Sequence, residues 1–110
     1  MKLLIVIDMQ NDFIDGSLGT KEAVAIVPNV AKKIAKARAA GVTVVFTRDT
    51  HQSNYLKTQE GKNLPVLHCV DGSDGWQISS KLEVGDSRIF DKPSFGSMEL
   101  ADYVATLRDL

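Results

Sequence analysis

The sequence predicts an α/β fold built on a parallel sheet, and three observations support this prediction. Residues 2–7 (KLLIVI) form a short continuous apolar run, which is typical of a strand that is covered on both faces. An amphipathic helix is expected after this run, and residues 42–47 (VTVVFT) are rich in β-branched side chains, which indicates a second strand. Strand, helix and strand form a βαβ unit, so the two strands should be parallel and their crossover right-handed.

The helix of this unit is predicted to carry Pro28 in its first turn, where a missing N–H costs nothing. Residues 15–19 (DGSLG) before it have the composition of a turn, and Gly41 stands where a helix C-cap would be. The apolar residues of the helix share one face, and its lysines fall elsewhere. The apolar face consists of Val27, Val30, Ala31, Ile34 and Ala37.

The second half of the chain has a weaker pattern of apolar residues. Residues 48–85 are punctuated by Gly, Ser, Asp and Asn, and a loop this long in a small domain is usually functional or ordered by a ligand. Residues 87–91 (SRIFD) predict a third strand, and Ser97 can cap a last helix. The apolar residues of that helix have helical spacing: Leu100, Tyr103 or Val104, and Leu107.

Length and composition indicate one small globular domain, residues 1–110, or part of a larger one. A net charge of −1 gives no electrostatic reason to expect nucleic acid or a membrane surface as a partner. No apolar stretch approaches the length of a membrane span or of a signal-peptide core, and the single cysteine, Cys69, excludes an internal disulfide. We therefore expect a cytoplasmic protein with neither nucleic acid nor membrane as a partner.

Charged residues stand where the three predicted strands end, namely Asp8, Asp49 and Lys92. The carboxyl ends of parallel strands share one edge of the sheet, and ligands bind in the crevice outside that edge. These three residues are therefore predicted to converge. A carboxylate at the end of a buried strand needs a partner, and Lys92 is the natural one for Asp8. The pair could serve as a general acid and base or as a structural salt bridge.

Both histidines lie in one segment of the chain. His51 follows Asp49 by two residues, and Glu60 lies between His51 and His68. In an extended chain, residues two apart point to the same side. Two imidazoles and two carboxylates suit zinc, iron(II) or manganese better than calcium. The same spacing also fits solvated loop acids and histidines that only pack or lie at the surface.

Four motifs resemble those of one enzyme family in their order and spacing: residues 5–13 (IVIDMQNDF), 47–51 (TRDTH), 64–76 (LPVLHCVDGSDGW) and 91–97 (DKPSFGS). The family is that of the isochorismatase-like cysteine hydrolases, and the nearest branch is the nicotinamidases and related amidases. The resemblance implies a doubly wound α/β fold, with a mostly parallel sheet and helices on both faces. These 110 residues look like the amino-terminal half of that domain.

The resemblance also implies roles for particular residues. Enzymes of the family use a Cys–Asp–Lys triad, in which Asp8 matches the base and Lys92 the lysine that favours the thiolate. Phe13 and Trp76 match positions that line the substrate pocket, although on composition alone such residues are more often part of the core. The family's nucleophilic cysteine lies on a later turn that these residues do not contain. Cys69 matches the metal-ligand segment instead and is expected to be a packing residue.

A metal beside the triad binds the pyridine nitrogen of the substrate in the nicotinamidase branch. By resemblance, its ligands are Asp49, His51 and His68, with Glu60 at a position that some members use as a fourth ligand. We favour zinc, with iron or manganese as alternatives. Isochorismatases proper lack this full set of ligands, so the set indicates an amidase.

Three functions follow from these expectations. The first is a metal-dependent amidase of nicotinamidase type, which converts nicotinamide to nicotinate and ammonia. The second is a related cysteine hydrolase that acts on another small amide or carbamoyl substrate. The third is a truncated half-domain that binds metal without hydrolysis. In each case the first strand, central in the full sheet, would be a bare edge, so we expect pairing with the missing carboxy-terminal half or a homo-oligomer.

Overall fold

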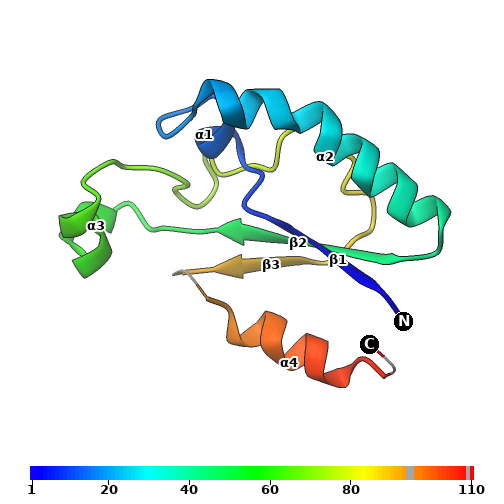
Figure 1. The fold of residues 1–110 in the computed structure, drawn as a ribbon. Coiled ribbons are helices and arrows are strands. Elements are labelled where there is room, and N and C mark those ends of the chain that lie inside the picture. The colour runs from blue at the N-terminus through cyan, green and yellow to red at the C-terminus, as the bar shows by residue number, and fades with distance from the viewer. Residues whose placement is uncertain (94–95, 109) are drawn as a thin grey trace.

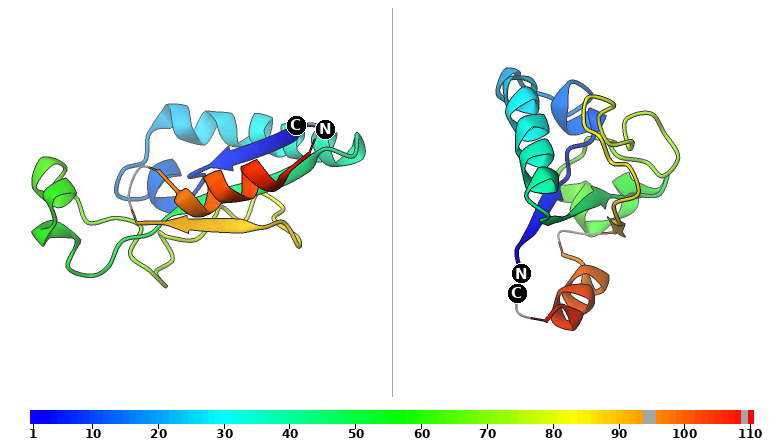
Figure 2. Two further views of the ribbon diagram at one scale, coloured as in Figure 1. Left: turned by 90° about the horizontal axis from the view of Figure 1, so that it is seen from below. Right: turned by 90° about the vertical axis from the view of Figure 1, so that its right-hand side faces the viewer.

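A three-stranded parallel sheet organises the computed structural model, which describes residues 1–93, 96–108 and 110. Its strands lie in the order β1 (Leu3–Ile7), β2 (Thr43–Asp49) and β3 (Ile89–Lys92). Helix α2 (Lys21–Ala39) lies over one face, and α4 (Met98–Thr106) lies on the opposite side (Figures 1 and 2). The predicted parallel α/β fold with helices on both faces is confirmed.

The main core lies between the sheet and α2. Val6 and Val44 are 6% exposed and Phe46 is fully buried, and these strand residues belong to one apolar cluster with Val27 and Ile34 of the helix. The two helix residues are among those predicted for its apolar face. The 3.6-residue period of the sequence therefore identified the side of α2 that packs on the sheet.

Helix α2 begins earlier than the sequence analysis predicted. The side-chain oxygen of Thr20 accepts a hydrogen bond from the N–H of Ala23, so the helix begins at Lys21 and Pro28 lies inside it. The prediction of Pro28 in the first turn was wrong because a hydroxyl cap sets the start of the helix. Pro28 leaves the carbonyl of Val24 without its helical donor. Val24 is 44% exposed, so water can reach this turn of the helix.

The two other predicted caps are confirmed. Gly41 follows the C-cap of α2 and has a φ of 74°, which a residue without a Cβ adopts freely. The side chain of Ser97 accepts a hydrogen bond from the N–H of Leu100 at the start of α4. Ser94 and Phe95, part of the fourth motif, lie outside the described residues.

Short helices occupy two regions where the sequence analysis expected none. Helix α1 (Asn11–Ile14) follows β1, and the segment after β2 contains a 3₁₀ turn, η1 (Tyr55–Lys57), and α3 (Gln59–Asn63). Each is too short to show a helical period in the sequence. The side-chain oxygen of Thr58 caps α3 by accepting from the N–H of Gly61. No helix in the described part of the chain has the length and apolarity needed to cross a membrane.

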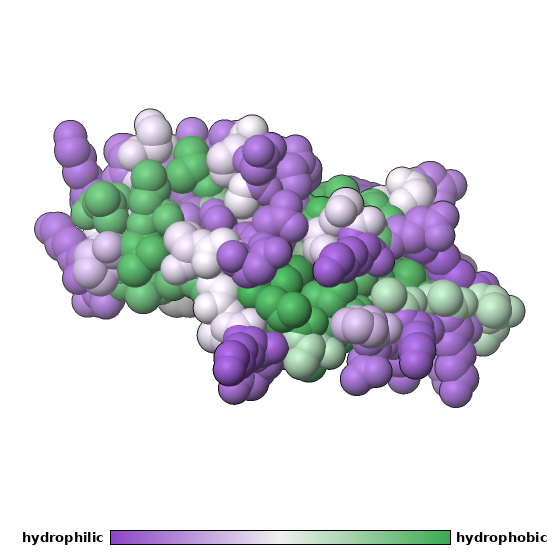
Figure 3. Space-filling view, turned by 90° about the horizontal axis from the view of Figure 1, so that it is seen from above, coloured by the Kyte–Doolittle hydropathy of each residue, from purple (hydrophilic) through white to green (hydrophobic). Residues whose placement is uncertain are grey.

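Strand β1 forms one edge of the sheet, because it pairs only with β2 among the described residues. An apolar groove runs between this strand and α2, and Ile7 at the end of the strand is 61% exposed. The groove is lined by Leu4, Ile5, Val6, Ile7, Met9, Val30, Lys33 and Ile34. Hydrophobic surface is visible in patches on the side of the molecule that carries α2 (Figure 3).

Candidate active site and metal centre

All three strands end on the same edge of the sheet, where the predicted charged residues meet (Figure 1). Asp8 follows β1, Asp49 ends β2, and Lys92 ends β3 as the register partner of Asp49. The ammonium Nζ of Lys92 lies 2.9 Å from Oδ2 of Asp8. The structure therefore brings together three residues that the sequence separates widely.

Both oxygens of the Asp8 carboxylate accept a hydrogen bond. Lys92 donates to Oδ2, and the hydroxyl of Thr47 donates to Oδ1 over 3.0 Å. Asp8 itself has a φ of 54°, and its N–H donates to the Thr47 carbonyl. A left-handed conformation of a non-glycine residue at a strand end is typical of functional sites. Thr47, opposite Ile7 in the strand register, is a site residue that the sequence analysis missed.

The two members of the Asp8–Lys92 pair differ in burial. The side chain of Lys92 is 7% exposed, whereas that of Asp8 is 25% exposed. A buried ammonium group requires a nearby anion, and the carboxylate of Asp8 supplies one. The exposed part of Asp8 leaves room for a reacting group to approach.

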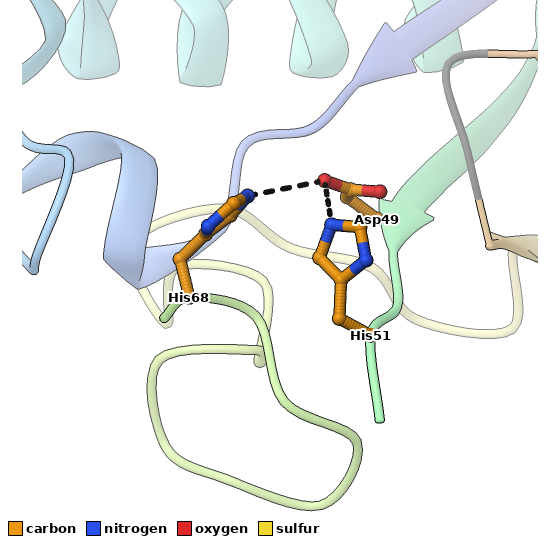
Figure 4. A group of neighbouring side chains, drawn as sticks. All are labelled: Asp49, His51 and His68. Atoms are coloured by element: carbon orange, nitrogen blue, oxygen red, sulfur yellow. Dashed lines mark hydrogen bonds and ion pairs between the residues drawn. The ribbon is translucent and has the colours of Figure 1, made fainter. Parts of the chain in front are cut away.

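Asp49, His51 and His68 form a compact group (Figure 4), and Asp49 is the strand-register partner of Lys92. Oδ2 of Asp49 lies 3.0 Å from Nε2 of His51 and 3.7 Å from Nε2 of His68. One ligand atom from each residue lies within 4.8 Å of the other two, and all three residues are buried. Two imidazole nitrogens and one carboxylate oxygen form a donor set found at catalytic zinc sites, so this group could hold a metal ion.

The ring of His68 is oriented by the backbone. Its Nδ1 lies 2.6 Å from the carbonyl of Val66, which can only accept a hydrogen bond. Nδ1 therefore carries a proton, and Nε2 is the ring nitrogen that faces Asp49. A carbonyl partner of this kind fixes the tautomer of a metal-ligating histidine.

Glu60, the fourth predicted ligand, lies next to this group on α3. Its Oε2 is 3.8 Å from Nε2 of His51, and its side chain is 21% exposed. Glu60 is thus near the metal group but is not among the three residues whose ligand atoms cluster.

Aromatic side chains enclose the two histidines. Tyr55, which the sequence analysis missed, is 1% exposed, and its ring centroid lies 4.3 Å from that of His51 and 4.9 Å from that of His68. Burial raises the pKa of Tyr55, and the charges of Glu60 and Asp49 raise it further, so its hydroxyl stays protonated. The hydroxyl donates to a backbone carbonyl of the same loop.

The two residues predicted to line a substrate pocket contact different residues near the site. Phe13 contacts the edge of the His68 ring, with centroids 5.5 Å apart. Trp76 donates from its indole N–H to the hydroxyl of Thr50, and the guanidinium of Arg48 lies 3.5 Å above its ring. One face of Trp76 is therefore already covered by a cation.

Cys69 follows His68 and is fully buried. Burial raises the pKa of its thiol to about 12, with Asp49, Asp12 and Asp8 adding to the shift. The thiol is thus neutral at physiological pH and closed to solvent. A nucleophilic cysteine needs the opposite properties, namely an accessible and stabilised thiolate.

Comparisons with known proteins place this geometry in a family. The family model described as the isochorismatase domain matches residues 2–110. The nicotinamidase of Saccharomyces cerevisiae is 30% identical in a match that covers 74% of this chain and 50% of that protein. This chain thus spans about half the length of the curated relative it matches.

Solved structures with the same fold include two amidases. The structure of a pyrazinamidase of Pyrococcus horikoshii in complex with zinc has a TM-score of 0.76 and 30% identity, covering 94% of this chain and 63% of that chain. The N-carbamoylsarcosine amidase of Thermoplasma acidophilum has a TM-score of 0.79 and 26% identity, covering 97% of this chain and 64% of that chain.

Proposed function

Since the chain belongs to the isochorismatase domain family, we propose that it supplies the acid–base pair and the metal group of a nicotinamidase-type amidase. Such an enzyme hydrolyses nicotinamide to nicotinate and ammonia. The observation that carries the proposal is the meeting of the Asp8–Lys92 pair with the group of Asp49, His51 and His68 on one sheet edge. Similarity to a nicotinamidase and to a zinc-bound pyrazinamidase supports it.

In this proposal Asp8 is the general base. Its carboxylate takes the proton of an attacking thiol, and the ammonium of Lys92, 2.9 Å away, stabilises the negative charge that remains at the site. The hydroxyl of Thr47 holds the second oxygen of Asp8, so that the carboxylate keeps one orientation. Phe13, against His68, would form part of the substrate pocket, with Trp76 at its margin.

Asp49, His51 and His68 would hold the metal, and Glu60, whose Oε2 lies 3.8 Å from Nε2 of His51, would be the candidate for a fourth ligand. We favour zinc because the donor set is nitrogen-rich and compact, with iron(II) or manganese as alternatives. A bound divalent metal supplies a Lewis-acidic position for the ring nitrogen of a pyridine amide.

The nucleophile is not Cys69, the single cysteine of the sequence, because that thiol is buried and neutral. The attacking thiol and the oxyanion hole would therefore come from another polypeptide segment. The free edge of β1, with its apolar groove, is the place where we propose that such a segment pairs with this one. Residues 1–110 would then form the amino-terminal part of one hydrolase domain.

The test is ammonia release from nicotinamide by the purified protein, with the intact mass measured on the same sample. Turnover that disappears on chelation and returns with zinc would support the nicotinamidase-type amidase. Full turnover without metal, or turnover only of a carbamoyl compound, would favour a related hydrolase instead; the structural similarity to an N-carbamoylsarcosine amidase makes this a specific alternative.

A second candidate function is metal binding without hydrolysis, and the burial of Cys69 favours it. Its signature would be stoichiometric zinc but no ammonia release from a sample whose only mass is 12.0 kDa.

A further inference from the structure

Two polar side chains of the turn after β1 reach into the site without touching the cluster of ligand atoms. The first is Gln10, which is completely buried. Its Oε1 accepts from the N–H of Asp49 over 2.7 Å, and its Nε2 donates to the carbonyls of Asp49 and Trp76, each over 2.8 Å. The amide thus satisfies both backbone groups of Asp49, as a neighbouring strand would do. It fixes the backbone from which the Asp49 carboxylate projects.

The second side chain is that of Asp12. Its Oδ2 accepts from the N–H of Cys69 over 2.7 Å. Cys69 has a φ of 49°, a left-handed conformation that costs a non-glycine residue free energy. A charge-assisted hydrogen bond to this N–H offsets that cost and holds the residue directly after His68.

The position of Asp12 is enforced by close packing. A Cβ added at Gly75 would lie 2.2 Å from the Asp12 carboxylate, so a side chain at that position would require the carboxylate to move. The backbone N–H of Asp12 also donates to the Gly75 carbonyl over 3.0 Å. The carboxylate is therefore confined between the loop at residue 75 and the backbone that carries His68.

We propose that Gln10 and Asp12 are positioning residues that align the two ligand-bearing segments with the turn that carries Asp8. Gln10 holds Asp49, and Asp12 holds the residue next to His68. Because both belong to the turn that begins at Asp8, the same contacts set the distance between the acid–base pair and the metal group. This inference rests on the proposed function, because it assigns the two side chains to a metal group. Outer contacts of this kind usually contribute to metal affinity through ligand orientation.

The test compares zinc binding by variants of the full chain. Asp12→Ala removes the carboxylate that accepts a hydrogen bond from the N–H of Cys69. Gln10→Glu replaces the amide nitrogen that donates to the carbonyls of Asp49 and Trp76 with an oxygen that cannot donate. Asp12→Asn keeps one acceptor oxygen and should rescue part of the loss. Asn11→Ala is the matched control, because Asn11 lies in the same turn and its side chain donates only to the exposed carbonyl of Asp74.

Three quantities would be measured: zinc affinity by competition with a chromogenic chelator, the visible spectrum of bound Co²⁺, and the melting temperature of the metal-free chain. Asp12→Ala and Gln10→Glu should weaken zinc binding by about 10- to 100-fold, the usual effect of removing an outer contact to a ligand, and should alter the Co²⁺ spectrum. Asn11→Ala should change neither the zinc affinity nor the Co²⁺ spectrum.

Folded Asp12→Ala and Gln10→Glu variants with wild-type zinc affinity and Co²⁺ spectrum would overturn the inference and leave the proposed function intact. An equal loss of affinity in Asn11→Ala would overturn it too, because any change in the turn would then have this effect. If Asp12→Ala does not fold, Asp12→Asn and Gln10→Glu decide. A wild-type chain that binds no zinc would overturn the metal group itself, and the inference with it.

Discussion

Lys92 is the residue on which the charge balance of the site depends. Its ammonium is 2.9 Å from Asp8, and the residue is only 6% exposed. Asp8 keeps a second partner in Thr47 and is partly solvated, so loss of the lysine weakens the pair without leaving a bare buried charge. The energetic consequence should therefore be moderate and the chemical consequence large.

We expect Lys92→Met to lower the free energy of unfolding by about 1.5–3 kcal/mol, the range for a hydrogen bond to a charged group. It should also abolish any amide hydrolysis, because the charge beside the base is lost. Urea denaturation and ammonia release would measure the two effects. Lys32→Met, at an exposed position of α2, is the control and should change neither. Unchanged hydrolysis in Lys92→Met would contradict the role of Lys92.

Cys69 provides a second test at the scale of single residues. Because the side chain is fully buried, we expect no alkylation by iodoacetamide in the folded protein and complete alkylation in guanidinium. Intact mass would count the modified thiols. Cys69→Ala should leave any hydrolysis in place, since a thiol from elsewhere would carry it. Rapid labelling of the native protein, or loss of hydrolysis in a folded Cys69→Ala variant, would show that Cys69 takes part in the reaction.

At the scale of elements, α2 is held to the sheet by its apolar face. Ile34 is 1% exposed within the core cluster, whereas Ile26 of the same helix is 46% exposed. Ile34→Ala should lower the free energy of unfolding by about 2–4 kcal/mol, because it removes buried methyl groups and leaves a cavity. Ile26→Ala should change it by less than about 0.5 kcal/mol. Equal effects of the two substitutions in urea denaturation would mean that α2 packs through a different face.

The short elements around the site show why the loop after β2 is ordered. Tyr55 of η1 packs on both histidines, and the hydroxyl of Thr58 caps α3, which carries Glu60. These contacts bring a candidate ligand to the metal group although the intervening chain forms no strand. A segment without clear periodicity is therefore structured by the site that it surrounds.

For the molecule as a whole, we expect association through the edge of β1. An edge strand with unpaired backbone groups beside an apolar groove is a template for another strand. We expect light scattering after gel filtration to give a mass above 12.0 kDa. Ile7→Lys, which places a charge at the exposed end of the edge, should shift the mass toward the single chain, whereas Ile26→Lys on α2 should not. A monodisperse wild-type particle of 12.0 kDa would refute this expectation.

Much of the site could be predicted because parallel strands impose a simple geometry. Asp8, Asp49 and Lys92 meet because each stands at the carboxyl end of a strand, and strand ends can be found from local composition. His51 joins them because it lies two residues beyond Asp49. The caps at Ser97 and Gly41 were equally accessible, since capping depends on residues only a few positions apart.

The parallel α/β fold, the face of α2 that packs and the edge where the charged residues gather could all be predicted from the sequence. These features depend on periodicity and on chain direction, which local side chains encode. Two contacts became visible only in the folded chain: Gln10 binds the backbone of Asp49, 39 positions away, and Asp12 binds the backbone of Cys69, 57 positions away. Such bonds form between groups that meet only after the chain has folded, because their geometry depends on how separate turns pack against one another and on no pattern within either turn.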